Sequence, residues 1–199
     1  MAAETILLLI IAVSLIGLLW PRFLGWALLR PYRVVREPRC RLTLISSGFV
    51  HADLGHLLFN LITFYSFGFG LERVMGSVQF VLLYVFGLLV SNVGTTLKHR
   101  DDPNYASLGA SGAILAVLFA SILYFPTQRI FLFFLPVPIP GAWFALGYLA
   151  LSYYWSRRPQ GRINHDAHLG GALAGMAFVA LTAPHAYLDF IDALRGHGR

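Results

Sequence analysis

The sequence consists mainly of apolar segments of helix length, separated by short polar connections. A soluble domain carries about 25% charged residues, whereas only 12% of this chain is charged and 57% is hydrophobic. Inside a bilayer the backbone must pair its own polar groups, which favours helices. We therefore expect an all-α, multi-pass integral membrane protein, and we place it in the cell membrane.

Six segments are predicted to cross the membrane and to form one bundle, a single domain over residues 1–199. Several are shorter than the ~20 residues of a straight span, which local thinning of the bilayer would accommodate. The first is not expected to be a signal peptide, because Met1-Ala2-Ala3-Glu4 lacks a positive region. The fifth begins only after three prolines, which remove amide donors. The predicted helices are 6–29, 54–70, 77–97, 111–124, 140–155 and 167–183.

The net charge of +6 does not indicate nucleic acid, because the arginines lie in short connections between apolar segments. Membrane lipids with anionic headgroups are the expected partner. The single cysteine, Cys40, excludes an intrachain disulfide. His51 and His56 are five residues apart, off a common helical face, and no cysteine or acid cluster accompanies them, so we expect no metal and no cofactor.

Two apolar segments each begin with a polar residue capable of acyl chemistry. Ser111 lies in Gly109-Ala110-Ser111-Gly112, and His168 follows Ala167 at the start of the sixth segment. A serine among small residues usually only packs, but a histidine inside a membrane is usually functional. The pair, at matching depth, indicates a nucleophile and its base.

The sixth segment predicts how these two residues meet. His168, Gly171 and Gly175 share one helical face, and the two glycines allow close approach of another membrane helix. The residues around Ser111 are also small. Contact between these faces would bring the Ser111 hydroxyl to the His168 imidazole.

The second segment offers donors for an oxyanion. His56 and Asn60 are four residues apart, on one face near the start of the helix. Acyl transfer places negative charge on a carbonyl oxygen, which an imidazole, an asparagine amide and the Ser111 backbone N–H would stabilise. The same two side chains would equally serve as hydrogen bonds between helices, and the residues alone leave both interpretations open.

These motifs, in this order and spacing, resemble the rhomboid family of intramembrane serine proteases over nearly the whole chain. The motifs are His51 to Asn60 with Gly68-Phe69-Gly70-Leu71-Glu72 and Gly76, then Gly109-Ala110-Ser111-Gly112, then Ala167-His168 with Gly171.

The resemblance implies a six-transmembrane-helix, rhomboid-like bundle that cleaves transmembrane segments of other membrane proteins with a Ser–His dyad. It makes Ser111 the nucleophile and His168 the general base. His56, Asn60 and the Ser111 backbone become the oxyanion donors. Structural roles follow for Glu72 and Gly76, and we add the packing glycines Gly171 and Gly175.

The chain departs from the family pattern at two positions. Cys40 precedes Arg41 where many members have tryptophan, and Leu115 replaces an aromatic ring that can stack on the histidine. His165 shares the face of His168 but lies one turn nearer the connection, so we expect it to be interfacial. Asp166, two residues from His168, is poorly aimed to orient that imidazole.

The membrane orientation has two opposite predictions. Eleven of the 15 basic residues lie in the first, third and fifth connections. The positive-inside rule therefore puts the amino terminus outside. The family resemblance implies the reverse, with the first helix starting in the cytoplasm.

Two other functions are compatible with parts of this pattern. A catalytically inactive rhomboid-like protein that binds or escorts membrane clients would share the fold, but it would be free to lose Ser111 or His168. A channel or transporter would need polar residues along a pore, whereas here they gather near the starts of three helices.

For a protease, residues 140–155 are the expected lateral gate, because bulky Trp143, Phe144 and Tyr148 replace a glycine stripe.

Overall fold

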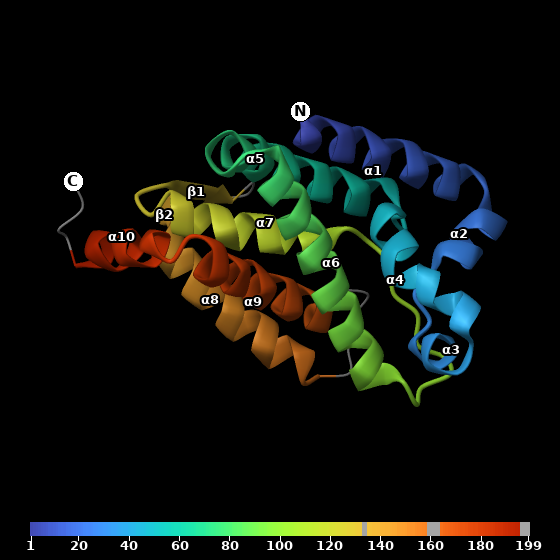
Figure 1. Cartoon of the computed structure of the whole chain (residues 1–199). Helices are drawn as coiled ribbons and strands as arrows, with labels where there is room; N and C mark the ends of the chain where they lie inside the picture. The colour runs from blue at the N-terminus through green and yellow to red at the C-terminus, as the bar shows by residue number, and fades with distance from the viewer. Residues whose placement is uncertain (133–134, 159–163, 196–199) are drawn as a thin grey trace.

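The computed structural model describes residues 1–132, 135–158 and 164–195, and it is mostly helical (Figure 1). Three helices are long and apolar enough to cross a membrane: α1 (Ala2–Leu19), α5 (Leu54–Met75) and α6 (Ser77–His99). Helices α9 (His165–Thr182) and α10 (His185–Leu194) are bent by 114° and make a fourth candidate if they form one broken span. The described residues thus hold three or four candidate spans by length and composition, where six were expected.

Helix α7 (Ser111–Tyr124) is the centre of the bundle and packs against α5, α6 and α9, and α6 also packs against α9 (Figure 1). Its residues from Gly112 to Leu123 are all buried. A helix enclosed in this way is apolar on every face, which explains why its sequence has no polar stripe. Helix α8 (Gly141–Ser156) packs beside α9 and leaves most of its large side chains exposed.

The first apolar segment is broken, although residues 6–29 were expected to be one helix. Helix α1 ends at Leu19, and α2 (Pro21–Ala27) begins with Pro21 after the non-helical Trp20. Proline removes an amide donor and disfavours helical geometry at the residue before it, so the break falls there. Four short helices that were not expected complete the connection: α3 (Pro31–Arg36), η1 (Pro38–Leu42), α4 (Thr43–Ser46) and η2 (Ser47–Phe49).

Helix α5 continues beyond the expected end at Gly70. It stops at Met75 because Gly76 has φ +83°, a left-handed conformation that suits glycine. A Cβ on Gly76 would meet open space, so the backbone conformation and not crowding requires glycine there.

Glu72 joins three elements at this end of the bundle. Its carboxylate accepts hydrogen bonds from the backbone N–H groups of Ala2 and Ala3 at 2.7 and 2.9 Å, and from the Ser77 hydroxyl at 2.6 Å. The side chain is only 3% exposed. It therefore holds the start of α1 against the turn between α5 and α6.

A β-hairpin precedes α8, so the chain is not entirely α. Strands β1 (Arg129–Leu132) and β2 (Leu135–Pro140) pair antiparallel, with Ile130 opposite Ile139. Prolines occupy every second position of β2, which puts their missing amides on one edge of the strand and leaves the other edge able to pair. The prolines that exclude a helix therefore permit a strand.

Candidate active site

Ser111 and His168 are in direct contact, although 57 residues separate them in sequence. The His168 Nε2 atom lies 2.9 Å from the Ser111 Oγ atom. Ser111 is the first residue of α7, and His168 is in the first turn of α9. The two helix starts thus present one hydroxyl and one imidazole to each other.

Glycines bring α7 and α9 close enough for this contact. A Cβ on Gly171 would overlap the backbone carbonyl of Gly112, and one on Gly175 would overlap the backbone of Ala116. Neither backbone has a flexible end that could move aside. Only glycine at these two positions allows the present distance between the helices.

The turn before Ser111 is held by backbone contacts from the first connection. Gly109 donates to the Ser47 carbonyl at 2.8 Å, and Ser107 and Leu29 exchange two hydrogen bonds of 2.9 Å. Gly109 has φ +115°, and a Cβ there would lie 2.8 Å from the His56 ring. Glycine is therefore required at position 109 by both conformation and space.

His51 supports the same turn, a role that the sequence-based reasoning missed. Its Nε2 atom accepts the Ala110 amide at 3.3 Å, and its Nδ1 atom lies 2.8 Å from the Ser14 hydroxyl. Ser14 donates its own proton to the Phe49 carbonyl, so His51 carries a proton on Nδ1 and none on Nε2. Burial, with a smaller contribution from His56, lowers the pKa of His51 to about 3, so the ring is neutral.

The His56 ring lies against the turn that leads to Ser111. It contacts His51 edge-on, with ring centroids 4.8 Å apart, and covers the face of Gly109. Asp53 caps α5 by accepting the His56 backbone N–H at 2.8 Å. The first turn of α5 therefore places the His56 imidazole against Gly109, which is two residues before Ser111.

Asn60 is buried, and its side-chain amide donates to the His56 carbonyl at 2.9 Å. No hydrogen bond joins Asn60 to Ser111 or His168 in the part of the chain that the structure describes. Its second N–H remains for another acceptor. Of the two side chains expected to serve an oxyanion, His56 is the one that contacts the serine turn.

Tyr148 is a second residue that the sequence-based reasoning did not place at the site. Its hydroxyl lies 3.0 Å from His168 Nδ1, and the two rings stack with centroids 6.4 Å apart. Leu115 leaves no aromatic ring on α7 for this purpose, and α8 supplies one instead.

The polar residues beside His168 have other partners. Asp166 accepts from Lys98 at 2.6 Å and lies 3.0 Å from His99, so it ties α9 to the end of α6. His165 stacks on Trp155 and meets the His168 ring edge-on at 6.0 Å. Neither residue hydrogen-bonds His168 among the described residues.

Asn164 joins the start of α9 to the serine turn. Its side-chain oxygen accepts the Ala167 N–H at 3.0 Å, which caps the helix. Its amide nitrogen donates to Ser107 at 2.8 Å and Thr95 at 3.1 Å. A hydrogen bond therefore links the start of α9 to the segment before α7, in addition to the glycine packing between the two helices.

A serine and a histidine at the starts of two helices of an apolar bundle are thus in hydrogen-bonding contact. The chain belongs to the rhomboid family, whose rhomboid domain matches residues 39–185.

Three relatives show the extent of the similarity. Rhomboid protein 1, mitochondrial, of Saccharomyces cerevisiae is 32% identical over 175 residues, which cover 84% of this chain and 50% of the relative. RHOMBOID-like protein 12, mitochondrial, of Arabidopsis thaliana is 34% identical over 65% of this chain and 43% of the relative. Presenilin-associated rhomboid-like protein, mitochondrial, of Homo sapiens is 34% identical over 68% of this chain and 36% of the relative.

The chain thus spans half or less of the length of these relatives. The names of these relatives describe them as mitochondrial, so the comparisons do not support the expected location in the cell membrane. The apolar helices and the family do support an integral membrane protein.

Proposed function

We propose that this chain is an intramembrane serine endopeptidase that cleaves transmembrane segments of other membrane proteins. The observation that carries the proposal is the 2.9 Å contact between Ser111 Oγ and His168 Nε2. A serine hydroxyl is a weak nucleophile until a base takes its proton, and this distance is within the reach of such a base. Membership of a family of intramembrane proteases supports the same conclusion.

In this mechanism Ser111 Oγ attacks the carbonyl carbon of the scissile peptide bond while its proton passes to His168 Nε2. The tetrahedral intermediate then breaks the C–N bond, and His168 returns the proton to the leaving amine. Water attacks the acyl-serine in the same way and releases the new carboxylate. Because Nε2 must accept first, His168 carries its resting proton on Nδ1 and donates it to the Tyr148 oxygen, 3.0 Å away.

The oxyanion of that intermediate needs donors in a dry site. The Ser111 backbone N–H lies in the first turn of α7, where amides lack partners within the helix. His56 lies beside the same turn, and the second N–H of Asn60 is one turn further along α5. We assign these three groups to the oxyanion.

The fold of the proposed enzyme is one domain with six spanning helices, in which α7 and α8 cross together with the longer helices. Helix α7 has 14 residues, about 21 Å, which is shorter than the hydrocarbon core. Enclosure by its neighbours makes a short helix acceptable, since it does not face lipid. Ser111 then lies below the membrane surface, where a substrate helix must locally unwind, because helical hydrogen bonds hide its carbonyls.

A fluorophosphonate probe tests the reactive pair in purified protein. We expect labelling at Ser111, no labelling in Ser111→Ala, and a sharp loss in His168→Ala, because the hydroxyl then has no base. His165→Ala is the matched control, since it removes a neighbouring imidazole that does not contact Ser111, and it should keep most of the labelling. Label is measured by gel fluorescence and located by peptide mass spectrometry.

Cleavage of a model transmembrane substrate in detergent, by the unaltered chain and by Ser111→Ala, completes the test. Labelling that survives in Ser111→Ala, or equal losses in both histidine variants, would contradict the assigned pair. A folded chain that neither labels nor cleaves would favour a client-binding protein instead.

A further inference from the structure

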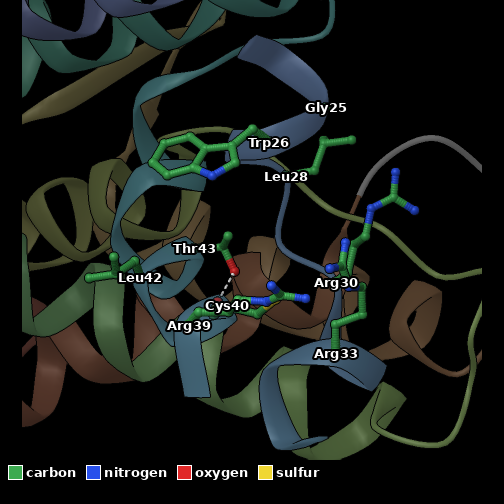
Figure 2. Close-up of a pocket in the computed structure, with 9 residues that line it drawn as sticks. All are labelled: Gly25, Trp26, Leu28, Arg30, Arg33, Arg39, Cys40, Leu42 and Thr43. Atoms are coloured by element: carbon green, nitrogen blue, oxygen red, sulfur yellow. Dashed lines mark hydrogen bonds between the residues drawn. The ribbon is translucent and has the colours of Figure 1, made fainter. Parts of the chain in front are cut away.

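A basic pocket lies in the first connection, away from the Ser–His pair. It has a volume of about 440 Å³ and is formed by α2, α3, η1 and α4. Arg30, Arg33 and Arg39 line it together with Trp26 and Leu28 (Figure 2). None of the groups in the proposed proteolytic mechanism belongs to this pocket.

The pocket carries an excess of positive charge. Residues 21–43 include six arginines and one acid, Glu37. Glu37 binds Arg33 at 2.9 Å and Arg39 at 3.1 Å. Arg30 makes no ion pair with any residue in the described part of the chain. One carboxylate thus pairs with two of the three guanidinium groups, and the pocket keeps a net positive charge that suits an anion.

The surroundings of the pocket indicate that this anion belongs to a lipid. Trp26 and Leu42 line the pocket and are each 63% exposed, and the nearby Trp20 is 57% exposed. Helix α2 follows directly on the end of the spanning helix α1, so the connection lies at the end of the bundle (Figure 1). Exposed tryptophans next to arginines are typical of the interface between headgroups and acyl chains.

We propose that this pocket binds the phosphate group of an anionic phospholipid. Guanidinium groups match phosphate oxygens in charge and shape, often with two hydrogen bonds from one arginine. Arg30 and Arg39 donate to the phosphate, while Trp26 and Leu42 lie against the glycerol and the upper acyl chains. A zwitterionic lipid fits less well, because its choline cation would lie near the other arginines.

The site attaches the first connection to the bilayer surface. That connection in turn holds the serine turn through the Leu29–Ser107 pair and the Ser47–Gly109 hydrogen bond. Lipid binding is nevertheless a property independent of proteolysis, and it can be measured without activity.

The test measures lipid binding to the Ser111→Ala chain in detergent by native mass spectrometry. Dioleoyl phosphatidylglycerol and dioleoyl phosphatidylcholine are titrated separately, and phosphatidylglycerol should bind more tightly. Arg30→Gln with Arg39→Gln should weaken phosphatidylglycerol binding about 10- to 30-fold, from two lost charge contacts. Arg22→Gln with Arg41→Gln removes the same charge from exposed positions outside the pocket and is the matched control, with little expected effect.

The single variant Arg30→Gln separates lost lipid binding from misfolding, because the Arg30 side chain makes no hydrogen bond among the described residues. It should keep the melting temperature and still weaken binding. Equal binding of both lipids, or equal losses in the pocket and control variants, would overturn the proposal. Inorganic phosphate binding as tightly as the lipid would also overturn it, in favour of a soluble phosphate ligand.

Discussion

At the residue scale, the proposed reactive centre is a chain of three side chains from three helices. Ser111 of α7 contacts His168 of α9, and His168 contacts Tyr148 of α8. A base that is held by one hydrogen bond and one stacked ring has little freedom to rotate away from the nucleophile. The orientation of His168 therefore depends on a side chain of a different helix.

Removal of the Tyr148 hydroxyl should slow the chemical step. In Tyr148→Phe the ring still stacks on His168, but the hydrogen bond to Nδ1 is lost. We expect kcat to fall about 3- to 10-fold, which corresponds to about 1 kcal/mol for one hydrogen bond, while KM stays the same. Steady-state cleavage of a model substrate measures both constants.

Tyr153→Phe is the matched control, because Tyr153 lies on the same helix and is 50% exposed. It should leave kcat unchanged. Unaltered kcat in Tyr148→Phe across the pH range would show that the hydroxyl does not orient the base.

His51 should make the fold sensitive to acid. It lies in the link before α5, outside the membrane-spanning helices, and burial lowers its pKa from 6.5 to about 3. Between these two pH values the unfolded chain binds a proton that the folded chain does not. The free energy of unfolding therefore falls as the pH drops through this window, by at most about 1.4 kcal/mol per pH unit.

The variant His51→Gln keeps an acceptor for the Ala110 amide but does not titrate. This variant binds up to one proton fewer on unfolding, so its free energy of unfolding should fall less steeply on acidification. Chemical denaturation across this pH window measures the slope. His185→Gln removes an exposed histidine and should retain the original slope. Identical slopes for His51→Gln and the unaltered chain would contradict the prediction.

At the element scale, α8 is the helix best suited to move aside for a substrate. Helix α9 is held against α7 by glycine contacts with backbone, whereas α8 packs through larger side chains. An apolar cavity of about 120 Å³ also lies between α7, α8 and α10, so the inner face of α8 is incompletely filled. Because Tyr148 is on this helix, opening would also release His168.

The structure corrects one part of the gate expected from the sequence. Trp143 was expected to hold α8 in place, but its side chain is 68% exposed. Phe144 is half-buried and packs against a buried apolar cluster that includes Leu118 and Phe119 of α7. The contact that closes the proposed gate is therefore that of Phe144.

Trimming Phe144 should loosen the gate. In Phe144→Ala, lost packing lowers the melting temperature, while cleavage of a substrate embedded in liposomes becomes faster because α8 separates more easily. Trp143→Ala on the same helix is the control and should change neither value. An equal response in both variants, or slower cleavage in Phe144→Ala at full folding, would place the gate elsewhere.

At the scale of the whole molecule, the hydrogen bonds of Glu72 and the proposed reactive pair lie at opposite ends of the bundle. Glu72 ties α1, α5 and α6 together, and it lies 16 residues along α5 from His56, about 24 Å away. The Ser–His pair lies at the other end, where α7 and α9 begin. A change at Glu72 can therefore weaken the fold without displacing the reacting groups.

Glu72→Gln should lower stability and leave catalysis intact. The neutral amide is a poorer acceptor for the three bonds, so we expect a loss of about 1.5–3 kcal/mol, seen as a lower melting temperature. Turnover per folded molecule should not change. Glu4→Gln, at an exposed acid of the same helix end, is the control. Slower turnover of folded Glu72→Gln would show that the two ends are coupled.

Much of this arrangement could be predicted from local sequence. Apolar length marked most of the helices, the three prolines before α8 marked a break, and the small-residue faces of Ser111 and His168 indicated that the two would meet. The exact break at Trp20 and the extension of α5 past Gly70 were missed. Both boundaries depend on the backbone conformation and hydrogen bonds of the residues at the helix end, which the mean hydropathy of a segment does not describe.

The sequence by itself indicated an apolar, helical membrane protein, and it indicated that Ser111 and His168 meet through glycines, because each of these features leaves a periodic or compositional pattern along one segment. Only the tertiary structure decided that Tyr148 holds the base, that His51 holds the serine turn, and that three arginines share one pocket. These contacts join segments that are distant in the chain. Their partners depend on how the helices approach one another in space, and no pattern within a single segment encodes that approach.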